Sequence, residues 1–498
     1  MPLARPRGLP LRAAALSLLL SGCVAEPRLG PRAAIRPVQE FAAGRSLAPA
    51  VAADATWPGG DWWHGYNDPQ LTALIGEGLS GAPDIAAAVA RLRQAEGYRQ
   101  QAGAALLPQI DGQASIGGAK QSGRMGAPLP PALGGWKDTA SASLAASFDL
   151  DLWGKNRANL RAATSDAEAA SLDVAQARLL LSTTIASAYA DLARYYAERD
   201  VEANAVQLRL DTQKLVANRV AIGLDTRAEL KQADSAVPAE RAQLAAIEES
   251  IALTKNRIAA LLGEGPDRGL TIQRPTLRFA ARTVPADVTT DLIGRRPDIV
   301  SARTRVESSA ERIKAARADF YPSVSLSALI GVQSLGISNL FLSGSSYGQA
   351  GAAISLPIFH GGEIKGKYRV ARGTYDEAVA TYDGTVASAF HDVADAVTSQ
   401  SMLSEQLTQS RQSLSDAREG YDVARQRYEG GLSDYLTVLT AQNSVLTEQR
   451  IVVDLEARAF TLDVALVKAL GGGAVAPVSP SSTARADAGA VSRETIHG

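Results

Sequence analysis

The chain has 498 residues, in which 51 Lys and Arg nearly balance 52 Asp and Glu to give a formal net charge of −1. This balance gives no reason to expect a nucleic-acid partner, which a strongly basic chain would favour. Hydrophobic residues make up 46% of the chain but aromatic residues only 5%, a composition typical of long, closely packed helices. No run of eighteen apolar residues occurs, so the sequence predicts no transmembrane helix.

The N-terminus has the features of an export signal. Residues 1–22 combine three arginines with an apolar run and small residues, which predicts a signal peptide. Leu20-Ser21-Gly22-Cys23 resembles the lipobox of bacterial lipoproteins, and Cys23 is the only cysteine, so it cannot form an internal disulfide. We expect lipidation of Cys23, with palmitate among the acyl chains, and a lipid-anchored tether over residues 23–60, which are rich in Pro, Ala and Gly.

Four segments alternate apolar and small polar residues with a period of two, which predicts two β-hairpins, 109–152 and 323–359. Strands of about ten residues, tilted by about 40°, span roughly 25–30 Å, the apolar thickness of an outer membrane. Four strands cannot close a barrel, and unpaired edge groups are costly in lipid, so several copies would have to share one. A soluble four-stranded sheet with one face on a helical core explains the alternation equally well.

Very long helices should flank the hairpins. A helix is expected over 84–107, and another from Lys155 to about Arg219 would be roughly 100 Å long. Gly223-Leu224-Asp225 breaks that helix, and Asp225 is expected to cap the next one, which runs to Leu262.

The same order of elements then recurs. Pro297-Asp298-Ile299 matches Pro83-Asp84-Ile85, and Gly431-Leu432 matches Gly223-Leu224, which predicts a tandem internal repeat. We expect a first repeat over 61–263, a linker over 264–296, a second repeat over 297–471 and a disordered tail over 472–498.

The turn at Gly430-Gly431 is followed by a 4-3-4-3 spacing of mostly apolar residues. This spacing predicts a coiled-coil seam in which a single asparagine sets the register. Its members are Leu432, Leu436, Leu439, Asn443 and Leu446.

No catalytic residue, metal site or cofactor is expected. Gly344-Ser345-Ser346-Tyr347-Gly348 fits the G-x-S-x-G pattern, but a loop leads into a strand there, whereas a nucleophile elbow needs a strand followed by a helix. The four histidines show no spacing typical of metal ligands.

Five motifs stand out along the chain: the lipobox, Trp62-Trp63, Phe148-Asp149-Leu150-Asp151-Leu152-Trp153-Gly154, Arg295-Arg296-Pro297-Asp298-Ile299 and Gly431-Leu432-Ser433-Asp434-Tyr435-Leu436. Together they resemble the lipoprotein (NodT-like) branch of the TolC-type outer-membrane efflux factors, over essentially the whole mature chain. This resemblance implies an α+β membrane protein: a homotrimer whose twelve strands, four per chain, form one transmembrane β-barrel continuous with a long periplasmic α-helical barrel.

The function that the resemblance implies is a passive exit duct in the outer membrane. Such a duct receives drugs, metals or other solutes from an inner-membrane pump, of the RND type, through a periplasmic adaptor. The alternative is a lipid-anchored periplasmic coiled-coil adaptor or scaffold without a pore, although such a protein would have no use for two membrane-length hairpins.

A duct must be shut at rest, and the helical turns are the expected place for its periplasmic gate. Relatives commonly contribute a carboxylate after the second turn, but the matching position here is Thr440, with Thr437 one turn earlier. Leu436 and Asp434, together with Asp225 of the first turn, complete the gate candidates. Leu436 as coiled-coil core and Asp434 as a simple helix cap is the other interpretation of these two residues.

Overall fold

The computed structural model describes residues 27, 29–41, 44–47, 51–52, 57–120, 122, 134–276, 284–285 and 288–473. The predicted signal peptide, the predicted lipidation site Cys23 and the part of the predicted disordered tail beyond residue 473 lie outside these ranges. The chain divides into two compact units, one of residues 1–35, 92–170 and 302–382, the other of residues 36–91, 171–301 and 383–498. None of the helices in the described ranges has the length and apolar composition that a membrane span requires.

The helices have the lengths that the sequence predicts. Two of them, α5 and α10, run for 67 residues each without an internal proline. Within the predicted linker lie α7 (Asp267–Leu270) and α8 (Val288–Arg295). The longer helices are α3 (Pro69–Gly81), α4 (Pro83–Ala104), α5 (Lys155–Ala221), α6 (Arg227–Leu262), α8 (Val288–Arg295), α9 (Pro297–Ala318), α10 (Glu363–Glu429) and α11 (Tyr435–Ala469). The short ones are η1 (Val38–Glu40), α2 (Gly44–Leu47), η3 (Trp62–Tyr66), α7 (Asp267–Leu270) and η5 (Ile337–Asn339).

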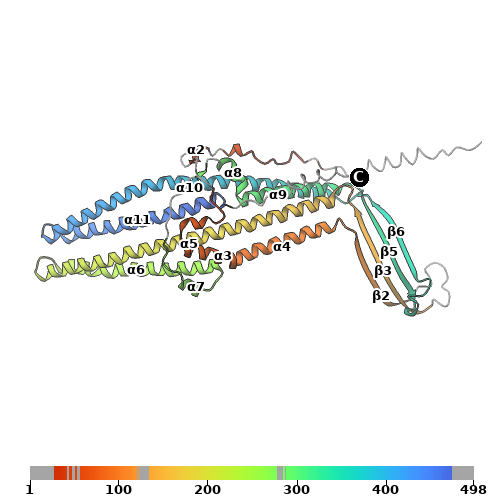
Figure 1. Cartoon of the computed structure of the whole chain (residues 1–498), viewed down its shortest axis with the longest axis horizontal. Coiled ribbons are helices and arrows are strands. Elements are labelled where there is room, and N and C mark those ends of the chain that lie inside the picture. Colours follow the sequence, from red (N-terminus) through yellow and green to blue (C-terminus); the bar gives the residue numbers. More distant parts are fainter. Residues whose placement is uncertain are drawn as a thin grey trace, which may run out of the picture. The chain divides into compact units, whose positions relative to one another are not determined.

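Four antiparallel strands form one sheet in the first unit, in the order β2-β3-β5-β6 (Figure 1). They are β2 (Gln109–Lys120), β3 (Trp136–Leu150), β5 (Ser323–Leu335) and β6 (Ser346–Ser355). The two predicted hairpins are thus neighbours in a single sheet. A separate short parallel pair joins β1 (Val51–Ala52) to β4 (Val284–Pro285).

The register places all odd-numbered residues of the four long strands on one face and all even-numbered residues on the other. One row of the polar face runs from Gln113 through Ser143 and Gly331 to Tyr347. A row of the apolar face runs from Ile110 through three alanines, Ala146, Ala328 and Ala350. The predicted two-faced sheet is therefore confirmed, including the exception, Leu329, which lies on the polar face opposite Gln349.

The strand ends differ from the prediction at two points. β3 ends at Leu150 and β6 ends at Ser355, so both stop short of the predicted hairpin ends at residues 152 and 359. Pro357 explains the early end of β6, because proline has no backbone N–H to donate to a neighbouring strand.

Residues 29–41 of the predicted tether lie against α10. Leu29 packs on an apolar cluster of the first unit that includes Phe320 and Tyr368. The α10 residues that hold this segment are four, seven and seven positions apart, so they share one face of the helix. The contacts are Arg372 Nη2 to Gly30 O (3.2 Å), Ala33 N to Asp376 Oδ1 (3.1 Å), Arg36 N to Asp383 Oδ1 (3.2 Å) and the Phe41 ring on the Phe390 ring (6.3 Å between centroids).

The second unit has an aromatic anchor where the sequence predicted the start of packed structure. Trp62, Trp63 and Tyr66 are buried in one cluster with Phe460 of α11. The side chain of Asp68 accepts a hydrogen bond from Leu71 N and so caps α3, as its position before Pro69 predicted.

Candidate functional site at the helical turns

Two turns of the same geometry end α5 and α10. At the first, Leu224 N donates to Arg219 O (2.9 Å) and Gly223 N to Val220 O (3.1 Å). The second turn repeats this pattern through Leu432 and Gly431, and both glycines have a positive φ, 79° and 73°. These are Schellman motifs, which favour glycine because other residues are strained at such φ values. The predicted helix breaks are therefore confirmed.

The caps of the helices after the turns agree with the sequence at one turn and differ at the other. Asp434 caps α11 as predicted: its carboxylate accepts from Thr437 N and Thr437 Oγ1, and these bonds lower the pKa of Asp434. Asp225 does not cap α6. Thr226 does so instead, in a reciprocal capping box with Glu229.

Asp225 has a different task. Its carboxylate pairs with Arg219 (3.0 Å from Oδ2 to Nε) and accepts a hydrogen bond from the hydroxyl of Tyr428 on α10. The Arg219 guanidinium also lies over the Tyr428 ring, 4.4 Å from its centroid. The bond to Asp225 raises the pKa of Arg219, whereas burial and then Asp225 raise the pKa of Tyr428. These contacts tie the first turn to the helix that precedes the second.

The predicted coiled-coil seam of α11 is shifted. Tyr435, Val438, Gln442 and Leu446 are buried, whereas Leu436 is 59% exposed. The stripe that includes Tyr435 and Val438 is buried instead, because it packs in one apolar core with Val216, Tyr421 and Tyr428. Only Leu446 of the predicted seam is fully buried; Leu439 is half-buried, and Leu432 lies exposed in the turn.

The gate candidates of the second turn line one open groove of about 570 Å³ between α10 and α11. Three small residues, Ala417, Gly420 and Ala424, form the α10 wall. The α11 side carries Asp434, Leu436, Thr437 and Thr440 together with Ala441 and Ser444. Asp225 is not among the lining residues.

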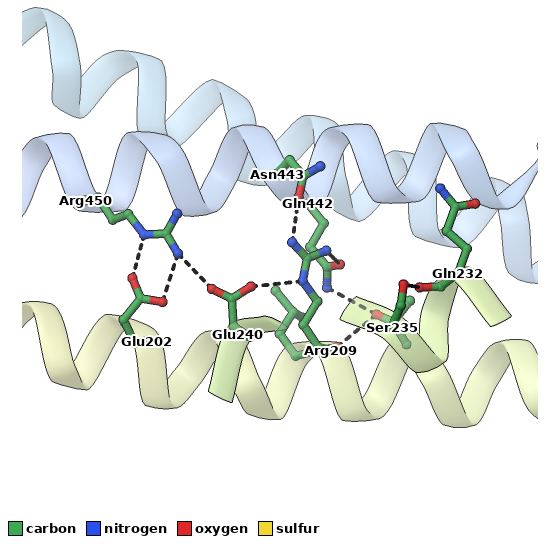
Figure 2. Close-up of polar contacts among 10 residues, drawn as sticks. Glu202, Arg209, Gln232, Ser235, Glu240, Gln442, Asn443 and Arg450 are labelled. Carbon is green, nitrogen blue, oxygen red and sulfur yellow. Dashed lines mark hydrogen bonds and ion pairs between the residues drawn. The ribbon is translucent and has the colours of Figure 1, made fainter. Parts of the chain in front are cut away.

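A buried cluster of charges lies further along α11, where this helix faces α5 and α6 (Figure 2). Arg450 of α11 reaches Glu202 of α5 (2.5 and 2.8 Å) and Glu240 of α6 (2.8 Å). Arg209 of α5 reaches the other oxygen of Glu240 (3.3 Å). Arg209 also donates to Asn443 Oδ1 (2.5 Å) and to Gln442 Oε1, so the predicted polar seam residue Asn443 is held by an arginine.

The cluster is electrically balanced, with two arginines and two glutamates. Burial raises the pKa of Glu240, with a contribution from neighbouring Glu202. Burial also acts to raise the pKa of Glu202, but the hydrogen bonds from Arg450 outweigh it, so the pKa of Glu202 is lowered. Three helices are thus joined by ion pairs whose carboxylates little water can reach, since the side chains of Glu202 and Glu240 are 2% and 9% exposed.

This cluster is not among the sites predicted from the sequence. A pattern that could have indicated it is present on α5, where the charged residues Glu202, Arg209 and Arg219 occur among apolar residues at heptad-like spacings of seven and ten. A charge at such a core position needs a buried partner. The partners lie on α6 and α11, which only the tertiary structure brings alongside.

Comparisons with known proteins agree with this architecture. The family described as "Outer membrane efflux protein" matches residues 74–264 and 288–472. Fusaric acid resistance protein FusA of Burkholderia cepacia is 35% identical over 370 residues, 73% of this chain and 69% of FusA. The chain belongs to the outer membrane efflux protein family. The crystal structure of the outer membrane protein VceC of Vibrio cholerae superposes with a TM-score of 0.80 at 43% identity, over 84% of this chain and 100% of VceC.

Membership of this family makes the chain an outer-membrane exit duct for efflux, and not an enzyme. The interpretation as a pore-free periplasmic adaptor is thereby set aside. Ser345 directly precedes β6 and Ser346 is its first residue, so the helix that must follow the serine of a nucleophile elbow is missing here. Within the described ranges no group of histidine, cysteine and acidic side chains is arranged to hold a metal ion.

Proposed function

We propose that three copies of this chain close a twelve-stranded barrel in the outer membrane, continuous with a periplasmic tunnel of helices, and conduct solutes passively. The observation that carries this proposal is the two-faced sheet. In the described structure β2 pairs only with β3, and β6 only with β5, so both edges offer free backbone groups. Lipid around the apolar face forbids such edges, and pairing β6 of one copy with β2 of the next removes them.

The matched lengths of the elements support a tandem duplication. α4 and α9 have 22 residues each, α5 and α10 have 67 each, and α6 and α11 have 36 and 35. A trimer of duplicated halves gives six similar helical hairpins around one axis.

The partners that fit such a duct are an inner-membrane pump, of the RND type, and a periplasmic adaptor. A passive pore supplies no energy, so a pump must drive export. The names of two relatives suggest drug-like substrates: FusA is a fusaric acid resistance protein, and MdtP of Escherichia coli, 30% identical over 70% of this chain and 72% of MdtP, is a multidrug resistance outer membrane protein.

Cys23 is proposed as the lipid-anchor site. Six residue steps separate it from Leu29, a reach of at most about 22 Å. Leu29 packs beside Ile364, just after the start of α10, and β6 ends a few residues before that helix. A lipid on Cys23 can therefore enter the same membrane that the sheet would span.

Replacing Cys23 by serine is expected to lower the yield in the outer membrane without abolishing it. The anchor is lost, but four strands per chain still partition into lipid. Fractionation on a sucrose gradient, with gels run before and after boiling, measures both location and trimer. Complete release as a soluble monomer would contradict the membrane barrel.

For the gate, we propose a ring of three Leu436 side chains at the second turn, with Asp434 and Thr437 holding the start of α11. Its support is the high exposure of Leu436 in a single chain, in the groove that it shares with Thr440. An exposed leucine beside a turn can contact its copies on a three-fold axis. The Arg219–Asp225–Tyr428 contacts would keep the two turns of each copy together.

Leu436→Ala is expected to raise single-channel conductance in planar bilayers, because the proposed ring loses its apolar bulk. Ile451→Ala, also on α11 but 15 residues further along, is the matched control and should leave conductance unchanged. Leu446 is a less suitable control because it is buried, so its truncation would create a cavity. Intact trimers with unchanged conductance would place the gate elsewhere, and trimers of both proteins that never conduct would contradict the duct.

A further inference from the structure

Two carboxylates meet beyond the buried charge cluster. Glu198 of α5 and Asp454 of α11 both contact one guanidinium nitrogen, Arg194 Nη1, with 3.5 Å to Asp454 Oδ1. Because both carboxylates approach the same nitrogen, the two carboxyl groups lie close together, and a proton held between them would relieve their mutual repulsion. The Glu198 side chain is largely buried, at 12% exposure, while Asp454 is at 56%.

The pair continues a polar seam between α5 and α11. Along α5, Arg209, Glu202 and Glu198 face Gln442, Arg450 and Asp454 of α11 in antiparallel order. The first two levels are complementary, since each has an arginine with its acceptor. At the third level like groups meet, and a single arginine cannot neutralise two ionised carboxylates.

No second cation from the neighbouring helices compensates the excess negative charge of these two carboxylates in the described structure. On α5, Glu202 is occupied by Arg450; on α6, Glu240 is shared by Arg209 and Arg450. From α10, Arg411 pairs with Glu456 rather than with Asp454. Arg194 therefore remains the cation of the pair.

We propose that Glu198 and Asp454 form a pH-responsive latch: with one proton shared between them they hold α11 against α5, and when both ionise they repel and free α11 to move. Since α11 carries the proposed gate, this inference rests on the proposed function. The pH around the helices would then regulate opening of the duct through this carboxyl pair, independently of the contacts at the turns.

The direction of the response follows from the pKa of Glu198. Burial and then the neighbouring carboxylate of Asp454 raise that pKa from 4.5 to about 7, although Arg194 opposes the rise. Because the folded pKa is raised, the stabilising proton is held at pH 6 and lost as the pH rises through about 7. None of the four histidines lies in residues 194–219 or 435–458, so the seam has no imidazole to titrate in this range.

The test compares the wild type with Glu198→Gln, whose amide can donate to Asp454 at every pH. In planar bilayers the open probability of the wild type should rise about tenfold between pH 6 and 8, following the ionised fraction of a group of pKa about 7. Glu198→Gln should stay at the low value at both pH values. Glu456→Gln, on the exposed pair of the same helix, should keep the wild-type pH profile.

Thermal unfolding provides a readout that does not depend on a pore. The melting temperatures of wild type and Glu198→Gln should be similar at pH 6, and the variant should be the more stable at pH 8. Equal pH profiles of melting temperature would overturn the shared proton. A melting difference without a difference in open probability would overturn the link to gating and leave the duct intact, whereas trimers that never conduct would refute the duct itself.

Discussion

Arginine in place of Leu144 or Leu326 is expected to destabilise the membrane-inserted sheet by about 2–4 kcal/mol, as charged residues do at mid-membrane on the lipid face of a barrel. Both positions are even-numbered and lie on the apolar face, where Leu144 pairs with Ile330 and Leu326 with Ala352. Refolding into lipid vesicles, followed by urea titration and by the fraction of trimer on unboiled gels, measures the loss.

The matched controls lie one residue away on the same strands. Ser143→Arg and Ser325→Arg place the same charge on the polar face, which would line a water-filled lumen, so their cost should be small. Because the strand and the introduced arginine are the same in each pair of variants, any difference in stability between them reports the face of the sheet alone. Equal damage on both faces would favour a soluble sheet packed on other protein.

A second large effect is expected at the buried charge cluster. Arg450→Met removes the cation that is bonded to Glu202, whose side chain is 2% exposed, and so leaves a buried carboxylate without its ion-pair partner. Loss of one partner from a fully buried pair costs about 3–5 kcal/mol, and because the Arg450 side chain is 38% exposed, solvent screening should keep the loss near the lower end of that range. Urea unfolding followed by circular dichroism should show that decrease in the free energy of unfolding.

Two further variants make this expectation specific. Arg411→Met breaks the exposed pair with Glu456 and should cost at most about 1 kcal/mol. The double variant Arg450→Met with Glu202→Leu removes both charges and should recover most of the loss, because the unpaired ion causes the damage. A double variant as unstable as Arg450→Met alone would show that the packing of the arginine stem matters more than charge.

Of the two aspartates at the helical turns that the sequence predicts to cap helices, one does so and the other does not. Asp434 caps α11 because Thr437 N stands three residues on, a relation contained in the sequence itself. Asp225 also precedes a helix, but Thr226 is the cap and Asp225 is recruited by Arg219 and Tyr428. Two adjacent residues could both cap, and the choice between them depended on a side chain 203 positions away.

The sequence by itself determined the features that repeat locally: the two faces of the strands, the 67-residue helices, and the breaks at Gly223 and Gly431. Each follows from a period of two, from the absence of proline, or from a glycine that accepts positive φ. Only the tertiary structure decided which stripe of α11 is buried and which charges meet on α5, α6 and α11. Helix periodicity leaves neighbouring stripes nearly equivalent, and the choice falls to whichever partners the other helices present.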